Sequence, residues 1–215
     1  MTCQICETRR PRRHCPGVRG EICAPCCGTH REVTVDCPLD CVYLRDARRH
    51  EKQPPLDSSP LPHPDIEVTE TFIEERQGLF ALAAVALYEA ATQTSGAIDS
   101  DVGEALEALI QTRRTVQSGL IYETKPSNLV AAAIQQRFGQ AEGEFRAALR
   151  ERTGMESIRE ADMLGVLVFL QRLAISNHNG RKRCRAFIDF LRSHFSPQPG
   201  RMESLLDSGP ALIVP

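Results

Sequence analysis

The feature that most constrains this chain is the placement of its cysteines. Eight of the nine lie in the first 41 of 215 residues: Cys3, Cys6, Cys15, Cys23, Cys26, Cys27, Cys37 and Cys41. The same segment has few apolar side chains and contains no Phe or Trp. A segment with so small a core needs a covalent or metal cross-link to hold one fold. We therefore expect the cysteines to supply a cross-link rather than to pack as small hydrophobes.

Three kinds of cross-link are available: disulfides, an iron–sulfur cluster and zinc. The opening residues lack the apolar region of a secretory signal, so we expect the reducing cytoplasm, where disulfides are rare. An iron–sulfur cluster needs only four thiolates and leaves the others unexplained. Zinc sites use pairs of ligands on short turns. Such pairs are present as Cys3-x2-Cys6, Cys23-x2-Cys26 and Cys37-x3-Cys41. Eight thiolates are enough for two zinc ions, which is the interpretation that the spacing favours.

The order of the cysteines suggests how they divide between two ions. We expect Cys3 and Cys6 to share one ion with Cys23 and with either Cys26 or Cys27. The second ion would take Cys15, Cys37, Cys41 and the remaining member of the Cys26–Cys27 pair, because adjacent side chains in extended backbone point apart. His30 is a reserve ligand, and the alternative for it is a solvated histidine that does not touch the ion.

These ligands resemble the cross-braced zinc fingers of the HIT and MYND families. The shared features are the C-x2-C opening, the HCP sequence of residues 14–16, and CxxCC followed by His30. In those families the first and third ligand pairs hold one ion, and the second and fourth hold the other. The resemblance matches Cys23 and Cys27 to the third pair. It also places Val18 where a second-pair cysteine belongs, so that Cys37 or Cys41 would have to supply that ligand.

Both the resemblance and the residues bear on function. The sequence CP-x-DC-x-YL of residues 37–44 is similar to the end of a cysteine-rich opening in bacterial proteins of uncharacterised activity. HIT and MYND fingers bind protein partners and are not catalysts, so the resemblance implies a recognition or assembly element. An all-thiolate zinc site is also closed, whereas a catalytic zinc keeps an open position for water. We therefore expect an adaptor that binds a protein or ribonucleoprotein partner, and not an enzyme.

Nucleic-acid binding through local basic clusters is the alternative. Residues 1–52 carry 10 basic and 7 acidic side chains, and residues 53–215 carry 16 and 21, so neither part is strongly basic. Phosphate contact would therefore depend on short clusters. The candidates are Arg9, Arg10, Arg12 and Arg13 in the first cluster, and Arg181, Lys182, Arg183 and Arg185 in the second.

The remaining sequence predicts a helical domain. Residues 53–65 contain five prolines and are expected to form a semi-rigid linker. From 66 to 195 the only proline is Pro126, and apolar residues recur at the three- and four-residue steps of helices. We expect a bundle of about five helices, over residues 67–91, 98–119, 127–154, 157–179 and around 187–191. The fourth is apolar nearly all round and should be central. A kink or a close helix crossing is expected in the third at Gly139 and Gly143.

The predicted fold class is thus mainly α, with a two-zinc module at 1–52, a linker at 53–65, a bundle at 66–195 and a flexible tail at 196–215. No apolar run is long enough to span a membrane. Glu142 and Glu144 are expected in solvent, and basic neighbours are expected to lower the pKa of Cys184. No histidine or acid lies close to Cys184 in the sequence, although an enzyme with an unrecognised site in the bundle remains a further alternative.

Overall fold

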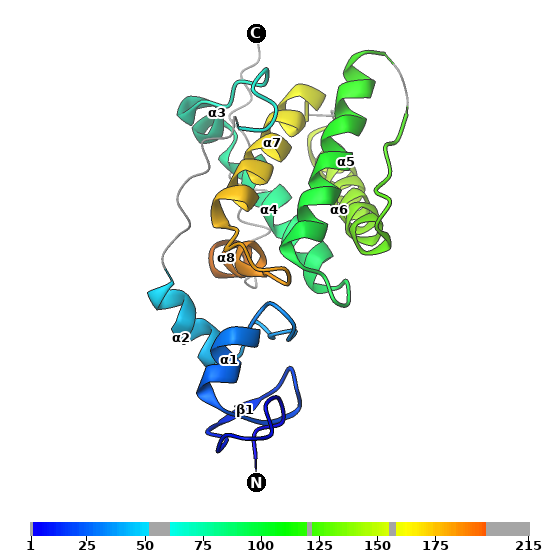
Figure 1. Ribbon diagram of the computed structural model, residues 1–215. Coiled ribbons are helices and arrows are strands. Elements are labelled where there is room, and N and C mark those ends of the chain that lie inside the picture. Colours follow the sequence, from blue (N-terminus) through cyan, green and yellow to red (C-terminus); the bar gives the residue numbers. More distant parts are fainter. Residues whose placement is uncertain (1, 52–60, 120–121, 155–157, 197–215) are drawn as a thin grey trace.

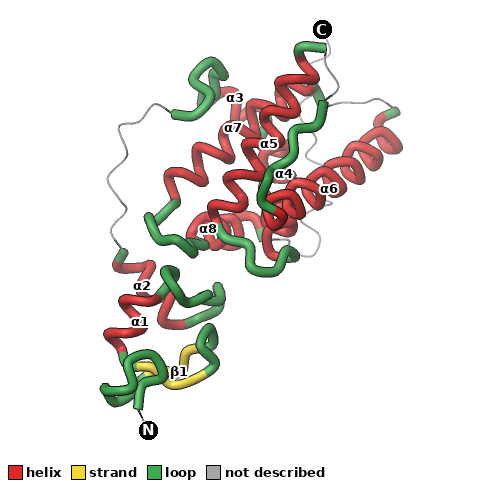
Figure 2. The backbone as a smooth tube through the Cα atoms, turned by 45° about the vertical axis from the view of Figure 1, so that its right-hand side comes forward, coloured by secondary structure: helices red, strands yellow, loops and turns green. Residues whose placement is uncertain are grey.

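The computed structural model describes residues 2–51, 61–119, 122–154 and 158–196, and it is mainly helical, as predicted (Figure 1). A small cysteine-rich module, residues 2–51, lies against one end of a helical bundle (Figure 2). Residues 53–60 of the predicted linker, residues 197–215 of the predicted tail and the last residue of the predicted module, Lys52, lie outside the described residues. Within the described ranges, no helix is long and apolar enough to cross a membrane.

The module is built from one hairpin and two short helices. Strands β1 (Arg13–Cys15) and β2 (Gly20–Ile22) pair antiparallel. Helices α1 (Ala24–His30) and α2 (Val42–His50) follow. The side chains of Ile22 and Leu44 are fully buried among the cysteines, and they form the small apolar centre that the sequence allows.

The bundle contains six described helices rather than about five. They are α3 (Glu70–Glu75), α4 (Gln77–Thr92), α5 (Asp99–Gln117), α6 (Leu129–Thr153), α7 (Glu160–Asn177) and α8 (Ala186–Phe195). The first predicted helix is interrupted at Arg76, which leaves the helical conformation at φ −118° and ψ 24°. Arg76 donates a hydrogen bond to Asp162 at 2.7 Å, and its guanidinium lies 4.4 Å from the centre of the Phe72 ring. This turn folds α3 back so that Phe72 packs on α7 at Gly165.

The third predicted helix is not interrupted at its two glycines, and no other described helix crosses closely there. Helix α6 continues unbroken through Gly139 and Gly143. A Cβ atom at either glycine would meet nothing within 4 Å, so no other element approaches closely enough to bend the helix there.

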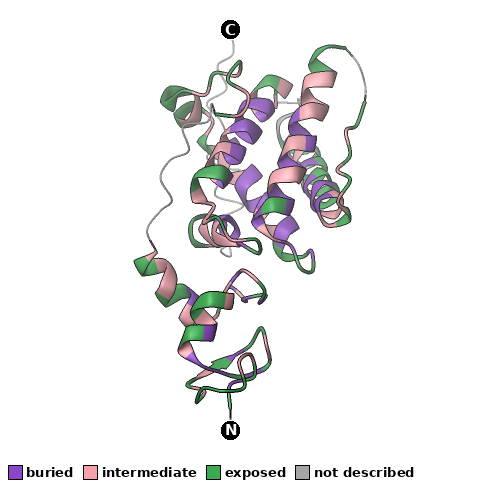
Figure 3. Ribbon diagram, in the orientation of Figure 1, coloured by how far each residue is buried: buried purple, intermediate pink, exposed green. Residues whose placement is uncertain are grey.

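Helix α7 is the central helix, as its apolar sequence predicts. Its buried residues belong to the core that it shares with α4, α5 and α8 (Figure 3).

Polar side chains fix the helix starts around α7. The carboxylate of Asp99, at the start of α5, accepts hydrogen bonds from the backbone N–H groups of Phe187 and Ile188 at 2.9 and 3.1 Å. Asp99 therefore caps α8, whose own N-cap residue supplies no side-chain cap.

Candidate metal centre

Four cysteine sulfurs converge within the module. Cys3 and Cys6 lie on the opening turn, Cys23 is the N-cap of α1, and Cys26 lies in its first turn. The turn is closed by the backbone N–H of Cys3, which donates to the carbonyl of Arg9 at 2.9 Å. The backbone N–H of Cys23 donates to Sγ of Cys3 at 3.2 Å. The hairpin thus carries the second cysteine pair back to the first.

The spacing of these sulfurs matches a tetrahedral metal site. The four ligand atoms all lie within 4.8 Å of one another, and Sγ of Cys6 lies 3.9 Å from Sγ of Cys23. Zinc–sulfur bonds of about 2.3 Å in a tetrahedron separate the sulfurs by about 3.8 Å. Cys3, Cys23 and Cys26 are buried and Cys6 is half-buried, so the group is shielded from solvent on most sides.

The charges of the group also fit a divalent cation. Hydrogen bonds from the Thr8 side chain and from the backbone at Arg9 and Thr8 lower the pKa of Cys6 to about 5. Burial, together with Cys23 and the other neighbouring thiols, raises the pKa of Cys26 to about 12. Four thiolates at this distance repel one another unless a cation lies between them. All nine cysteines are free thiols, and the four-cysteine group is consistent with a zinc-binding module.

The structure brings together four of the cysteines that the spacing assigned to the first group. The structure selects Cys26 as the fourth member, where spacing left Cys26 or Cys27 open and the HIT and MYND resemblance pointed to Cys27. Sγ of Cys27 instead accepts a hydrogen bond from Arg13 at 3.4 Å. Cys3 and Cys6 therefore share the group with Cys23 and Cys26.

A second complete group of ligands is not seen among the described residues. Cys15 and Cys37 are buried, and Cys27 and Cys41 are half-buried, in the same cluster as the first group. The reserve ligand His30 is not part of the four-cysteine group, and its Nδ1 lies 2.8 Å from the hydroxyl of Thr34. One group of four is therefore found where two ions were predicted.

The module is attached to the bundle through a buried carboxylate that no local sequence pattern indicates. Glu32 is fully buried and adopts a positive φ of 53° in the turn after α1. Its carboxylate accepts from Arg48 at 2.7 Å, from the side chain of Asn179 at 3.0 Å and from the backbone N–H of Arg185 at 3.0 Å. Burial opposes the charge of Arg48, but Glu32 and then Asp189 raise its pKa. A loop glutamate is ordinarily solvated, so only the folded structure identifies this one.

The second predicted basic cluster faces the module. Arg181 donates to the carbonyl of Arg31 at 2.6 Å, and Arg183 donates to Asp36 at 2.8 Å. The backbone N–H of Arg183 also donates to the carbonyl of Glu32 at 2.8 Å. Lys182 is exposed. In the sequence alone, this run of positive charges indicated an anionic partner. In the structure, the module of the same chain supplies part of the compensating contacts.

Two expectations about the bundle are wrong. Burial raises the pKa of Cys184 to about 12, and Asp99 adds to the effect, whereas basic neighbours were expected to lower it. The side chains of Arg181 and Arg183, close to Cys184 in the sequence, donate hydrogen bonds to the module instead. Glu142 is also buried rather than solvated, since Arg113 and Arg146 hold its carboxylate.

Comparisons with known proteins add no family to this description. No protein-family model, no curated protein and no solved structure matches the chain. The fold and site together define a mainly helical protein with a four-cysteine group, fitted to a metal ion, in its N-terminal module.

Proposed function

We propose that this chain is a non-catalytic, zinc-binding adaptor that holds a protein or ribonucleoprotein partner. The observation that carries the proposal is the closed set of four cysteine sulfurs within 4.8 Å of one another. With four thiolate ligands, a zinc ion has no position left for a water or a substrate. The ion's role is then to fold the module, and the folded surface of the module does the binding.

We further propose that the module holds two zinc ions, the second on Cys15, Cys27, Cys37 and Cys41. The supporting observation is a close backbone approach. A Cβ atom at Gly17 would lie 2.4 Å from the carbonyl oxygen of Asp36, so the loop after Cys15 runs directly against the segment before Cys37. Cys41 is the N-cap residue of α2, and a thiolate is favoured near a helix N-terminus.

Zinc counting of cysteine variants tests this division. The wild-type chain should carry two zinc ions, and Cys3→Ser and Cys37→Ser should each reduce the count because each removes a ligand from a different group. The Cys184→Ser variant is the matched control, since Cys184 lies buried in the bundle, and it should keep both ions. A wild-type count of one would remove the second site and leave the first.

The exposed face of the module is the proposed contact surface for a partner. Val42 is 58% exposed at the start of α2, and Arg45 and Arg49 follow it at helical spacing. Arg13 lies 4.6 Å above the ring of Tyr43, which places the loop of the first basic cluster beside this helix. An exposed apolar residue rimmed by arginines is typical of a recognition surface.

The same face supports the second candidate, an RNA or ribonucleoprotein contact. The side chains of Arg9, Arg10 and Arg12 are exposed, and none forms an ion pair within the described part of the chain. Unpaired arginines close together can contact successive phosphates. The second basic cluster offers less, because Arg181 and Arg183 are already bonded to the module.

Affinity capture with the zinc-loaded chain at increasing salt separates these candidates. Retained RNA that is lost by about 0.5 M salt supports phosphate contact. A protein partner that resists this salt and is lost on Val42→Asp supports the adaptor. If variants of this face release neither the RNA nor the protein, both candidates are contradicted.

A further inference from the structure

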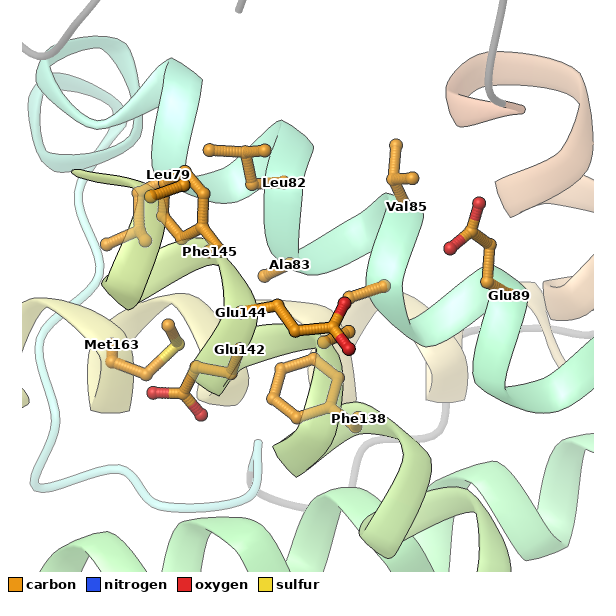
Figure 4. A pocket seen from close by; sticks show the side chains of 13 residues that line it. Leu79, Leu82, Ala83, Val85, Glu89, Phe138, Glu142, Glu144, Phe145 and Met163 are labelled. Carbon is orange, nitrogen blue, oxygen red and sulfur yellow. The ribbon is translucent and has the colours of Figure 1, made fainter. Parts of the chain in front are cut away.

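The bundle has an apolar groove between α4 and α6, on the part of the molecule that the metal module does not use. The groove has a volume of about 260 Å³. Leu82, Ala83 and Ala86 line it from α4, and Phe138, Phe145 and Ala148 line it from α6 (Figure 4). Met163 of α7 contributes to its lining.

The groove has the length of a short helix. Its lining extends from Leu79 to Glu89 on α4 and from Phe138 to Ala148 on α6. Ten residues of helix cover about 15 Å. An amphipathic helix that docks in a groove uses side chains at i, i+3 or i+4, and i+7, which span about 10.5 Å. The groove can therefore take three successive anchors of one helix.

The charged side chains that line the groove are all acidic. The carboxylates of Glu89 and Glu144 lie along it, and neither forms an ion pair within the described ranges (Figure 4). The third acid, Glu142, differs because Arg113 and Arg146 neutralise it. Among the residues that the structure describes, no lysine or arginine lines the groove. Two uncompensated carboxylates beside an apolar floor favour a basic occupant.

We propose that this groove binds a basic amphipathic helix of a partner protein, with apolar anchors on the floor and lysine or arginine beside Glu89 and Glu144. The chain's own C-terminal segment fits less well. Residues 197–215 contain two acids and a single arginine, so they do not complement the two glutamates. This surface is separate from the module, and its test does not depend on the proposed role of zinc.

Peptide titration of the full zinc-loaded chain tests the proposal. The probe is a fluorescent synthetic helix of 14 residues with leucines at i, i+4 and i+7 and lysines on its flanks. Its partner probe has glutamate at every lysine position. We expect the lysine peptide to bind at least about tenfold more tightly at 0.1 M salt, as opposite charges predict. Equal binding of the two peptides, or no binding, would overturn the proposal.

Variants of the chain localise the contact. Glu89→Gln with Glu144→Gln should weaken the lysine peptide about tenfold, and Leu82→Ala should weaken it without a change of charge. The matched control is Asp46→Asn with Glu123→Gln, which removes the same charge from exposed positions outside the groove and should leave binding unchanged. Equal weakening by the control would show non-specific attraction and overturn the proposal. Tighter binding after removal of residues 197–215 would show that the chain's own tail competes, which would also overturn it.

Discussion

At the scale of single residues, the most informative side chain is Glu32. It is fully buried, yet it carries a charge, and three groups from different parts of the chain donate hydrogen bonds to it. A buried charge is tolerated only where it is paired and hydrogen-bonded. Without the Glu32 carboxylate, Arg48 keeps Asp189 as its ion partner, but the donors of Asn179 and Arg185 lose their acceptor, so the cost of substitution should be large.

Glu32→Gln is predicted to lower the free energy of unfolding by about 3 kcal/mol, because Arg48 would lose one of its two carboxylate partners, the fully buried one. Urea unfolding of the zinc-loaded chain measures this change. Glu21→Gln is the matched control, since Glu21 pairs with His14 at an exposed position and the loss should be below about 0.5 kcal/mol. If the two changes lower the free energy of unfolding equally, Glu32 contributes no more to stability than an exposed glutamate does.

Cys184 is predicted to resist alkylation in the folded chain. Burial and Asp99 raise its pKa to about 12, so at pH 8 only about one molecule in ten thousand carries the reactive thiolate. Mass spectrometry after treatment with iodoacetamide should find Cys184 unmodified in native protein and modified in urea. Rapid modification of the native chain at this position would contradict the structure.

At the scale of elements, the helix starts are joined to one another. Asp99 begins α5 and caps α8, while Asp101 accepts from Asn128, whose side chain caps α6. Each cap therefore fixes the position of a second helix as well as its own. Side-chain caps stabilise helices because they satisfy backbone N–H groups that have no partner within the helix.

Asp99→Ala is predicted to lower the free energy of unfolding by about 2 kcal/mol, because two buried N–H groups of α8 would lose their acceptor. Thermal or urea unfolding measures the loss. Thr69→Ala removes the local cap of the short, exposed helix α3 and should cost only about 0.5 kcal/mol. A smaller effect at Asp99 than at Thr69 would be inconsistent with this role.

The sequence predicted the elements better than their connections. Helical spacing located the apolar central helix α7, and the spacing of Cys3, Cys6, Cys23 and Cys26 located the four-cysteine group. The break at Arg76 was missed because it depends on Asp162, 86 positions away along the chain. Glu32 was missed for the same reason, since its partners lie 16 to 153 positions away. Local patterns cannot report contacts made by distant residues.

At the scale of the whole molecule, the module and the bundle meet over polar contacts to residues 28–39. These residues lie between the first cysteine group and α2, and they accept hydrogen bonds from Arg181, Arg183 and Arg192. Leu39 of this segment belongs to the core of the bundle. The bundle therefore contacts a part of the module whose conformation depends on the neighbouring cysteines.

Metal removal is predicted to loosen one end of the bundle. Without an ion the module should unfold, because metal capture supplies the folding free energy of such small domains. Amide exchange should then rise in residues 178–185, which lose Glu32 and Asp36, while the centre of α6 stays protected. Exchange in residues 178–185 that is indifferent to a chelator would refute this coupling.

The most direct test of the account is hydrogen exchange of residues 2–51 combined with a zinc count on the same full-length sample. We predict bound zinc, and a loss of amide protection throughout residues 2–51 when a chelator removes it, with recovery on adding zinc back. A purified chain without zinc, or a module whose protection is unchanged after the metal is removed, would contradict the claim that cysteine-bound metal folds this segment.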